Sequence, residues 1–202
     1  MTPDGDDEPD QDPGARERLE AVRRGDATAI DGWYRSEHPQ VYRLCLGFLA
    51  DAHDADDLAQ DAMLRLLDRL DAWNPHRPWR QWRNTVVLNL CRDRLRRAGA
   101  RRRAEAEAAL IAIPGALPAP HEQLEASELR AALADTLRHL SPREREAFVL
   151  RDLAGEDTAD VAATLGVTPA TVRSLLTLAR RRLRTLLGPQ LSAHGLAPES
   201  SP

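Results

Sequence analysis

The chain has 202 residues, of which 42% are hydrophobic and 30% charged, a balance that excludes a wholly disordered protein. Aromatic residues make up only 4%, strand-like alternation is hard to find, and alanine, leucine and arginine dominate, so we expect an all-α fold. The net charge of −4 does not exclude DNA binding, because residues 1–13 carry six acidic and no basic side chains, and removing those six charges leaves +2. No apolar run is long enough to span a membrane and no signal peptide is present, so we expect a cytoplasmic protein without membrane insertion.

Composition divides the chain into two small helical domains joined by a flexible linker. The segment IAIPGALPAPHEQ holds three prolines and a glycine, which interrupt helices. The first residues are acidic and contain proline, which favours disorder. The expected order is a disordered acidic tail at 1–15, a helical domain at 16–104, a linker at 105–124, a second helical domain at 125–188 and a disordered tail at 189–202.

The first domain is expected to hold four helices, at Arg16–Arg24, Ala27–Leu49, Ala55–Leu70 and from Trp79 to about Arg97. Apolar residues recur at helical spacing in the second and third helices, which predicts their buried faces. The expected core residues there are Trp33, Val41, Leu44, Cys45, Phe48, Ala59, Ala62, Met63, Leu66 and Leu70. Cys45 and Cys91 lie in apolar helical runs, so we expect reduced core residues rather than a disulfide or a metal site.

The outer face of the third helix is acidic. It carries Asp57, Asp61, Leu64 and Asp68, which are spaced i, i+4, i+7 and i+11. Acidic side chains around one exposed leucine would suit the docking of a basic partner. The same spacing also fits an ordinary solvated face, and both interpretations stay open on spacing alone.

The fourth helix, WRQWRNTVVLNLCRDRLRR, combines tryptophan with arginine. Its expected core residues are Trp82, Val86, Leu90 and Leu95, and its polar, mostly basic side consists of Asn84, Asn89, Arg92, Asp93, Arg96 and Arg97. Aromatic rings beside arginines can stack unpaired bases while the arginines neutralise phosphates. Tryptophan is also a common core residue. We favour the core for Trp82, and both interpretations stay open for Trp79.

The stretch VAATLGVTPATVRSLLTLARRRLR is the most informative part of the chain. Gly166 can adopt the positive φ of a sharp helix stop, Thr168 is a good N-cap, and Pro169 suits the first helical position. The expected buried stripe is Val172, Leu176, Ala179 and Leu183, and the opposite side carries Arg173, Ser174, Thr177, Arg180, Arg181 and Arg184. This pattern predicts a helix-turn-helix whose second helix enters the major groove of DNA. A plain helical hairpin with a solvated arginine face is the alternative.

Taken in order, these motifs resemble bacterial RNA polymerase sigma factors, most closely the extracytoplasmic-function (ECF) group, which keeps two domains called regions 2 and 4. DAHDADDLAQDAMLRLL is similar to the polymerase-binding helix of the family, and RPWRQWRNTVVLNLCRDRLRR is similar to its promoter-melting and minus-ten-recognition helix. The stretch from Leu140 to Arg184 is similar to region 4. The resemblance implies a subunit that binds core RNA polymerase and directs promoter recognition and transcription initiation.

The resemblance also implies roles for individual residues. The residues that would dock on the polymerase β′ clamp helices are Asp57, Gln60, Asp61 and Leu64. Those that would lie along the minus-ten element are Trp79, Asn84, Asn89, Arg92, Asp93, Arg96 and Arg97. The loop at Asn74–Trp79 would capture a base flipped out of the non-template strand. Those that would read the minus-thirty-five element are Thr168, Arg173, Ser174, Thr177, Arg180, Arg181 and Arg184.

Further implied partners are the polymerase β flap, promoter DNA and an anti-sigma factor, whose capping an exposed Leu64 and Leu178 would suit. No catalytic residue, cofactor or metal is implied, because the polymerase core carries the chemistry. The sequence departs from the family where Leu175 and Leu178 replace common arginines and Thr177 replaces a frequent histidine or aromatic residue. Arg83 and Asn84 likewise stand where leucine and tyrosine are frequent.

Two other functional classes fit parts of the chain. A stand-alone helix-turn-helix transcriptional regulator would explain the second domain, but not the acidic and arginine–tryptophan helices of residues 16–104. An enzyme could draw on the acid–base candidates His38, His53, His76, Asp54 and Asp57. Their spacing matches no recognised site, and no glycine-rich phosphate loop is present.

Overall fold

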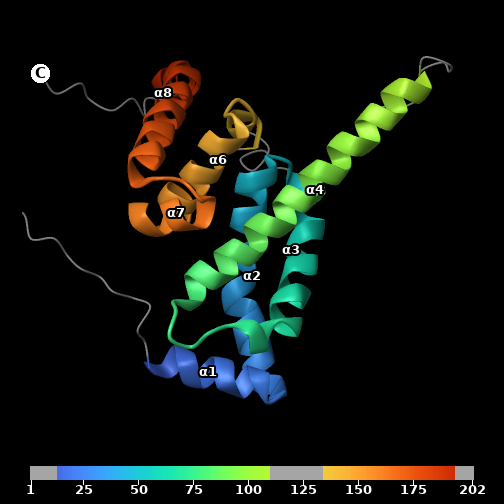
Figure 1. Ribbon diagram of the computed structural model, residues 1–202, viewed down its shortest axis with the longest axis vertical. Coiled ribbons are helices and arrows are strands. Elements are labelled where there is room, and N and C mark those ends of the chain that lie inside the picture. Colours follow the sequence, from blue (N-terminus) through green and yellow to red (C-terminus); the bar gives the residue numbers. More distant parts are fainter. Residues whose placement is uncertain (1–12, 110–133, 194–202) are drawn as a thin grey trace, which may run out of the picture.

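The computed structural model describes residues 13–109 and 134–193, with side chains at 16–104 and 134–186. Every regular element in these ranges is helical (Figure 1), which confirms the predicted all-α class. The first helix group consists of α1 (Pro13–Arg23), α2 (Ala27–Leu49), α3 (Ala52–Asp68), the 3₁₀ turn η1 (Leu70–Ala72) and α4 (Trp79–Ala109). The second helix group consists of a helical turn at 134–138, α6 (Pro142–Phe148), the π-helical turn η2 (Val149–Leu153), α7 (Thr158–Leu165) and α8 (Pro169–Ala193). Most of the predicted linker and of both predicted tails lies outside the described residues.

Side-chain caps set the helix boundaries of the first group. The Asp26 carboxylate accepts a hydrogen bond from the backbone N–H of Ala29 at 2.8 Å and starts α2 where the sequence predicts. The Asp51 carboxylate accepts from the N–H groups of His53 and Asp54, so α3 begins three residues before the predicted Ala55. The helix α4 continues well past the predicted end near Arg97, because the residues that follow are mostly good helix formers.

The core of the first helix group lies between α2, α3 and α4. All ten core residues predicted for the second and third helices are buried, and so are Cys45 and Cys91, which are free thiols. The prediction for α4 was wrong in part. Leu95 is 39% exposed on α4, whose C-terminal part projects beyond the other helices (Figure 1). Of the other predicted core residues, Trp82, Val86 and Leu90 are half-buried, while Val87 and Leu88 fill the core.

The helix-turn-helix prediction is confirmed. The axes of α7 and α8 meet at 99°, which excludes an antiparallel hairpin. Gly166 ends α7 with a φ of +67°, and Val167 donates its N–H back to the carbonyl of Ala162 at 3.0 Å. The Thr168 hydroxyl accepts from the N–H of Thr171 at 3.2 Å, ahead of Pro169 at the first position of α8. The predicted stripe of Val172, Leu176, Ala179 and Leu183 is buried.

The two helix groups pack against each other along α2 and α4 (Figure 1), an arrangement that the sequence did not predict. Val149 and Leu150 of η2 are fully buried in the same apolar cluster as the core of the first group. The backbone of α2 comes close at Gly47, where a Cβ atom would lie 2.8 Å from Cγ2 and 3.1 Å from Cγ1 of Val149. Only glycine therefore permits this approach.

No single helix among the described residues is long and apolar enough to cross a membrane. Within the part of the chain that the structure describes, one bent pair, α7 with residues 169–186 of α8, reaches the required length and apolar composition when the two helices are taken together.

Candidate functional site

The acidic face of α3 is the first of three candidate surfaces. Its members Asp57, Gln60, Asp61 and Leu64 are all exposed, and Leu64 is 64% exposed despite its apolar side chain. The opposite side of α3 packs into the core through Ala55, Ala59, Ala62 and Leu66, which fixes the direction of the acidic face. The structure therefore brings the four residues together on one open helix face.

The second candidate surface is the outer face of α8. Thr168, Arg173, Ser174, Thr177, Arg180, Arg181 and Arg184 are exposed, as predicted for this side of the helix. Arg180 is held in place by Asp152 of η2, which accepts from Nε at 3.0 Å and from Nη2 at 2.6 Å. This bidentate pair raises the pKa of Arg180. Leu178 is 45% exposed beside this surface, whereas Leu175 is half-buried against the core.

The third candidate surface, on α4, is divided by the structure. Asn89, Arg96 and Arg97 are exposed and Asp93 is half-buried, with Asp93 paired to Arg96 at 2.6 Å. The other three predicted minus-ten residues, Trp79, Asn84 and Arg92, face the protein interior or the second helix group. The seven predicted residues therefore do not form one continuous open surface.

Asn84 is the main correction to the sequence-based site. It was predicted on the open polar side of the helix, yet it is 0% exposed. Its Nδ2 donates to Oε1 of Glu156 at 2.6 Å, and its Oδ1 accepts from Nε of Arg83 at 3.0 Å. Arg83 is buried too, and its Nη1 donates to Oε2 of Glu37 at 2.8 Å. These side chains are buried because each finds a partner in another helix or loop, a requirement for buried polar groups.

Trp79 lies at the centre of the tryptophans at the start of α4. Its ring centroid is 6.3 Å from Trp33, 5.7 Å from Trp73 and 5.2 Å from Trp82. It is buried, so the core interpretation holds for its ring. The indole Nε1 atoms of Trp33 and Trp79 are buried without a hydrogen-bond partner in the described part of the chain.

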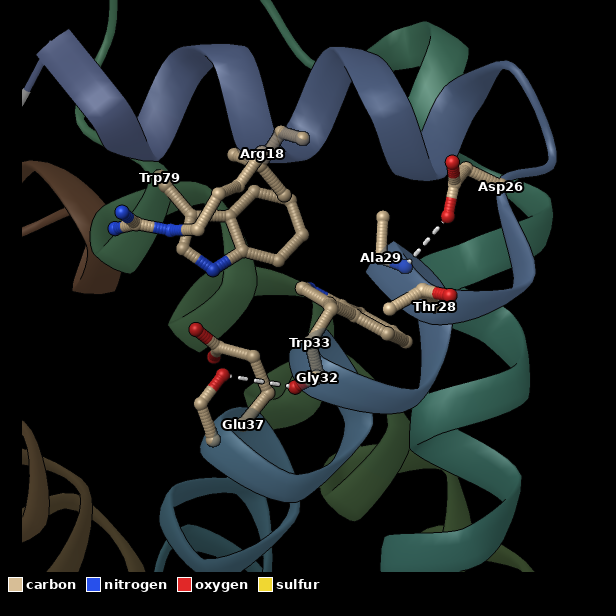
Figure 2. Close-up of a pocket in the computed structure, with 10 residues that line it drawn as sticks. Arg18, Asp26, Thr28, Ala29, Gly32, Trp33, Glu37 and Trp79 are labelled. Carbon is tan, nitrogen blue, oxygen red and sulfur yellow. Dashed lines mark hydrogen bonds between the residues drawn. The ribbon is translucent and has the colours of Figure 1, made fainter.

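A cavity of about 650 Å³ lies beside these tryptophans (Figure 2). Arg18 of α1 reaches across Trp79 on one side, and Glu37 of α2 lies below it, with Trp33 between α2 and the cavity. The loop at 74–78, which was predicted to receive a flipped base, does not line this cavity. Trp79 alone belongs to both the predicted loop and the cavity wall.

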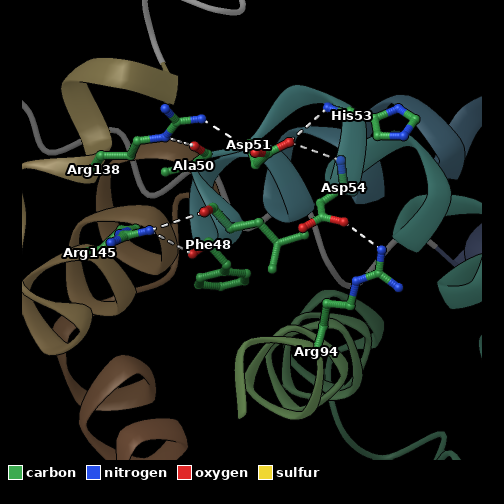
Figure 3. Close-up of polar contacts among 9 residues, drawn as sticks. Phe48, Ala50, Asp51, His53, Asp54, Arg94, Arg138 and Arg145 are labelled. Carbon is green, nitrogen blue, oxygen red and sulfur yellow. Dashed lines mark hydrogen bonds and ion pairs between the residues drawn. The ribbon is translucent and has the colours of Figure 1, made fainter. Parts of the chain in front are cut away.

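Polar contacts join the two helix groups at both ends of their interface. At one end, Arg145 donates to the carbonyls of Phe48 and Leu49 at 3.2 and 3.3 Å, and Arg138 donates to the carbonyl of Ala50 at 2.8 Å (Figure 3). These carbonyls end α2 and have no partner within the helix, so the two arginines cap it from the second helix group. Burial lowers the pKa of Arg145, and the positive charge of Arg138 lowers it further.

At the other end, four residues of α4 bind the second helix group. Arg92 forms a bidentate ion pair with Glu146 of α6, at 2.7 and 2.8 Å, which raises the pKa of Arg92. The remaining contacts are Arg80 Nη2 to the carbonyl of Ala154 at 2.6 Å, Gln81 Nε2 to Oδ1 of Asp160 at 3.0 Å, and Asn84 Nδ2 to Oε1 of Glu156 at 2.6 Å.

Among the acidic side chains at this interface, Glu156 has the most strongly shifted pKa. Burial raises its pKa to about 7, and the charge of Asp160 adds to the rise. The hydrogen bond from Asn84 and the charges of Arg83 and Arg80 oppose the rise without cancelling it. The second carboxylate oxygen, Oε2, is buried without a partner among the described residues.

Sequence reasoning missed the interface residues Gly47, Arg138, Arg145, Glu146 and Glu156. Each has its partner in the other helix group, 54 or more residues away along the chain, and periodicity reports only which face of a helix is apolar. Gly47, inside the apolar run of α2, was the one available signal, because glycine within a helix often marks close packing. Among the described residues, no group of three or more His, Cys, Asp or Glu side chains is placed to hold a metal ion.

Both helix groups match known protein families. Residues 33–101 match the family described as Sigma-70 region 2, and residues 130–183 match Sigma-70, region 4. The ECF RNA polymerase sigma factor SigM of Mycobacterium tuberculosis is 35% identical over 172 residues, which cover 85% of this chain and 84% of SigM. The chain belongs to the ECF RNA polymerase sigma factors. Its function is therefore to direct promoter recognition and DNA-templated transcription initiation, and the family is not catalytic.

Other relatives and solved structures agree with this family. The ECF sigma factor SigE of Mycolicibacterium smegmatis is 31% identical, over 89% of this chain and 70% of SigE. CnrH, solved in complex with the cytosolic domain of CnrY, is 25% identical, with a TM-score of 0.61 over 86% of this chain and 96% of CnrH. The sigma factor RpoE of Bartonella quintana, solved with the anti-sigma factor NepR, shares the fold at a TM-score of 0.61, 23% identity and coverage of 78% of this chain and 96% of RpoE.

The raised pKa of Glu156 predicts a pH-dependent stability. The folded state holds a proton between the usual pKa of 4.5 and about 7, where the unfolded state has lost it. The stabilisation is therefore complete below pH 4.5 and is lost as the pH rises through 7. Relative to Glu156→Gln, the free energy of unfolding of the wild type should fall by up to about 3 kcal/mol between pH 4.5 and pH 8, measured by urea denaturation. Glu17→Gln, at an exposed site, should follow the wild type, and parallel curves for all three proteins would contradict the prediction.

Proposed function

We propose that the acidic face of α3 docks on the clamp helices of the polymerase β′ subunit. The support is the exposure of Asp57, Gln60, Asp61 and Leu64 on one face whose opposite side is fixed in the core. Carboxylates around an apolar side chain favour a basic partner, with the charges guiding encounter and the leucine contributing buried area. The polymerase would carry the chemistry, and this role belongs to the cytoplasm, where polymerase and chromosome meet.

Reversing the charge of this face should abolish docking. The Asp57→Arg, Asp61→Arg double variant should bind purified bacterial core polymerase at least about tenfold more weakly than wild type and fail to direct initiation, because attraction becomes repulsion. The matched control is Glu17→Arg, Asp31→Arg, which changes the net charge equally at exposed sites on α1 and α2. Binding of the double variant at wild-type strength would contradict the docking face. If the wild-type protein does not bind core polymerase but binds duplex DNA specifically, the result would favour the interpretation as a stand-alone transcriptional regulator.

The minus-ten element would lie along α4. Asn89, Asp93, Arg96 and Arg97 supply an accessible polar surface, and Asn84 and Arg92 would add an amide and a guanidinium once the second helix group moves away. A flipped base would enter near Asn74 and Trp79. The cavity beside Trp79 supports this step, because its volume of about 650 Å³ and the indole rings of Trp33 and Trp79 in its wall offer room and aromatic faces for a nucleobase.

The minus-thirty-five element would be read in the major groove by the outer face of α8. The hydroxyls and arginines nearest its start, at Thr168, Arg173, Ser174 and Thr177, are exposed and would reach base edges. Arg180, Arg181 and Arg184 follow further along the helix, where contact with phosphate is favoured. The exposed Leu64 and Leu178 would be covered by an anti-sigma factor, a proposal supported by RpoE of Bartonella quintana, which was solved with the anti-sigma factor NepR.

Two arginines of α8 should differ in what they contribute to DNA binding. The Arg173→Ala variant should weaken the binding of holoenzyme to a promoter selected from random DNA about 10- to 100-fold. It should also relax discrimination at the base pair that Arg173 would contact. Arg184→Ala should weaken binding to all sequences alike and lower the slope of log affinity against log salt by about 1. Equal behaviour of the two variants in competition binding across salt concentrations would contradict these roles.

A further inference from the structure

One arginine on the outer face of α8 is held by a carboxylate, and its neighbours on that face are not. Asp152 of η2 accepts hydrogen bonds from Nε of Arg180 at 3.0 Å and from Nη2 at 2.6 Å, so the two side chains meet edge to edge. The side chains of Arg173, Arg181 and Arg184 form no ion pair with the residues that the structure describes. Of these four arginines, Arg180 alone is oriented by a partner within the described part of the chain.

The pair leaves the second edge of the guanidinium open. Asp152 occupies the edge formed by Nε and Nη2 of Arg180. The edge formed by Nη1 and the other Nη2 hydrogen has the geometry that binds a phosphate in a bidentate manner. The side chain of Arg180 is 53% exposed and that of Asp152 only 21%. The carboxylate is therefore the more covered partner, and the arginine stays accessible.

The carboxylate has a firm base. Asp152 belongs to η2, the π-helical turn at Val149–Leu153. Val149 and Leu150 of the same turn are fully buried, so the turn is anchored in the core. Turns of this kind are rare in proteins and often occur at functional sites.

A second ion pair on α8 offers a comparison within the same helix. Nη1 of Arg182 donates to Oε2 of Glu144 at 2.9 Å, and this pair also joins α8 to the rest of the second helix group. Residues two apart do not face the same way on a helix, so Arg182 and Arg180 lie on different sides of α8. The Arg182–Glu144 pair is therefore a brace away from the face proposed for DNA.

We propose that Asp152 is a positioning residue for DNA binding, which holds Arg180 ready for one backbone phosphate of the minus-thirty-five element. The inference rests on the function proposed for α8, and it adds a residue that does not itself touch DNA. A free arginine reaches phosphates from many placements of the helix, because its side chain is long and rotatable. An arginine held by Asp152 reaches a phosphate only where α8 is seated in its proper register, and its side-chain entropy is lost before DNA binds.

The charge of Asp152 acts in the same direction. A negative charge beside the DNA backbone opposes any association that depends on charge alone. At the proper register, the charge-assisted hydrogen bonds from the open edge of Arg180 offset this repulsion. On other DNA the repulsion remains without those hydrogen bonds. Asp152 should therefore favour the minus-thirty-five element over other duplex sequences.

Removing the carboxylate tests this role through a ratio of affinities. Holoenzyme is bound to a promoter selected from random DNA and to the same promoter with a scrambled minus-thirty-five element. Asp152→Asn keeps the shape of the side chain but loses its charge. We expect it to bind the scrambled duplex more tightly than wild type and the selected promoter no more tightly, so that the ratio falls about fivefold. Asp152→Glu, which keeps a carboxylate, should restore most of the ratio, and an unchanged ratio in Asp152→Asn would overturn the inference.

A double-mutant cycle separates positioning from net charge. Arg180→Ala should weaken binding to both duplexes, because a cation is lost. In the Arg180→Ala background, Asp152→Asn should leave the ratio unchanged, since no guanidinium remains to be positioned. If Asp152→Asn lowers the ratio equally with and without Arg180, the loss of negative charge alone explains the effect and the inference is overturned.

The matched control is Arg182→Gln, which removes the other ion pair of α8 and should keep the wild-type ratio. A fall in the ratio equal to that of Asp152→Asn would mean that both pairs only brace the helix, which would also overturn the inference. The proposed function fails by a different result. If wild-type holoenzyme binds the selected and scrambled duplexes equally well, α8 does not read the minus-thirty-five element.

Discussion

The contact between Val149 and the backbone of α2 at Gly47 is the constraint on which the rest of the arrangement depends. At this point a side chain of any size on α2 would push η2 away. With η2 seated, the carboxylates of α6, α7 and their connecting loop come within hydrogen-bonding distance of α4. The apolar seat supplies non-directional attraction, and the polar contacts around it fix the orientation.

Strong and imperfect contacts are mixed at this interface. The Arg92–Glu146 pair is bidentate, and the carbonyls that end α2 receive arginine donors. Glu156, by contrast, is 7% exposed with one oxygen unpartnered, and Arg145 has a buried nitrogen without a partner among the described residues. Buried polar groups that lack partners reduce the net stability of a contact. This mixture of complete and incomplete polar contacts is typical of two packed units that separate when a partner offers better contacts. A permanent core would leave fewer buried polar groups without partners.

Local chemistry made much of the fold predictable. The start of α2 at Ala27, the cap at Thr168, the glycine stop at Gly166 and the apolar stripe of α8 depend on residues close in sequence, and each was predicted correctly. The exposure of Leu64 followed from its place opposite the buried face of α3. Asn84 was placed wrongly, because a polar residue is expected at the surface unless a distant partner buries it. Its partner, Glu156, is 72 residues away, and no helical period reports such a pairing.

The central claim is that the packed arrangement of the free chain must open for promoter binding. Spin labels at Asp31 on α2 and Thr185 on α8, both exposed, report the distance between the two helix groups, while the buried native cysteines stay unlabelled. Pulsed electron–electron double resonance on the free chain should give one short, narrow distribution of label-to-label distances. The holoenzyme on promoter DNA should give a clearly longer distance. The same distribution in both states would contradict the account.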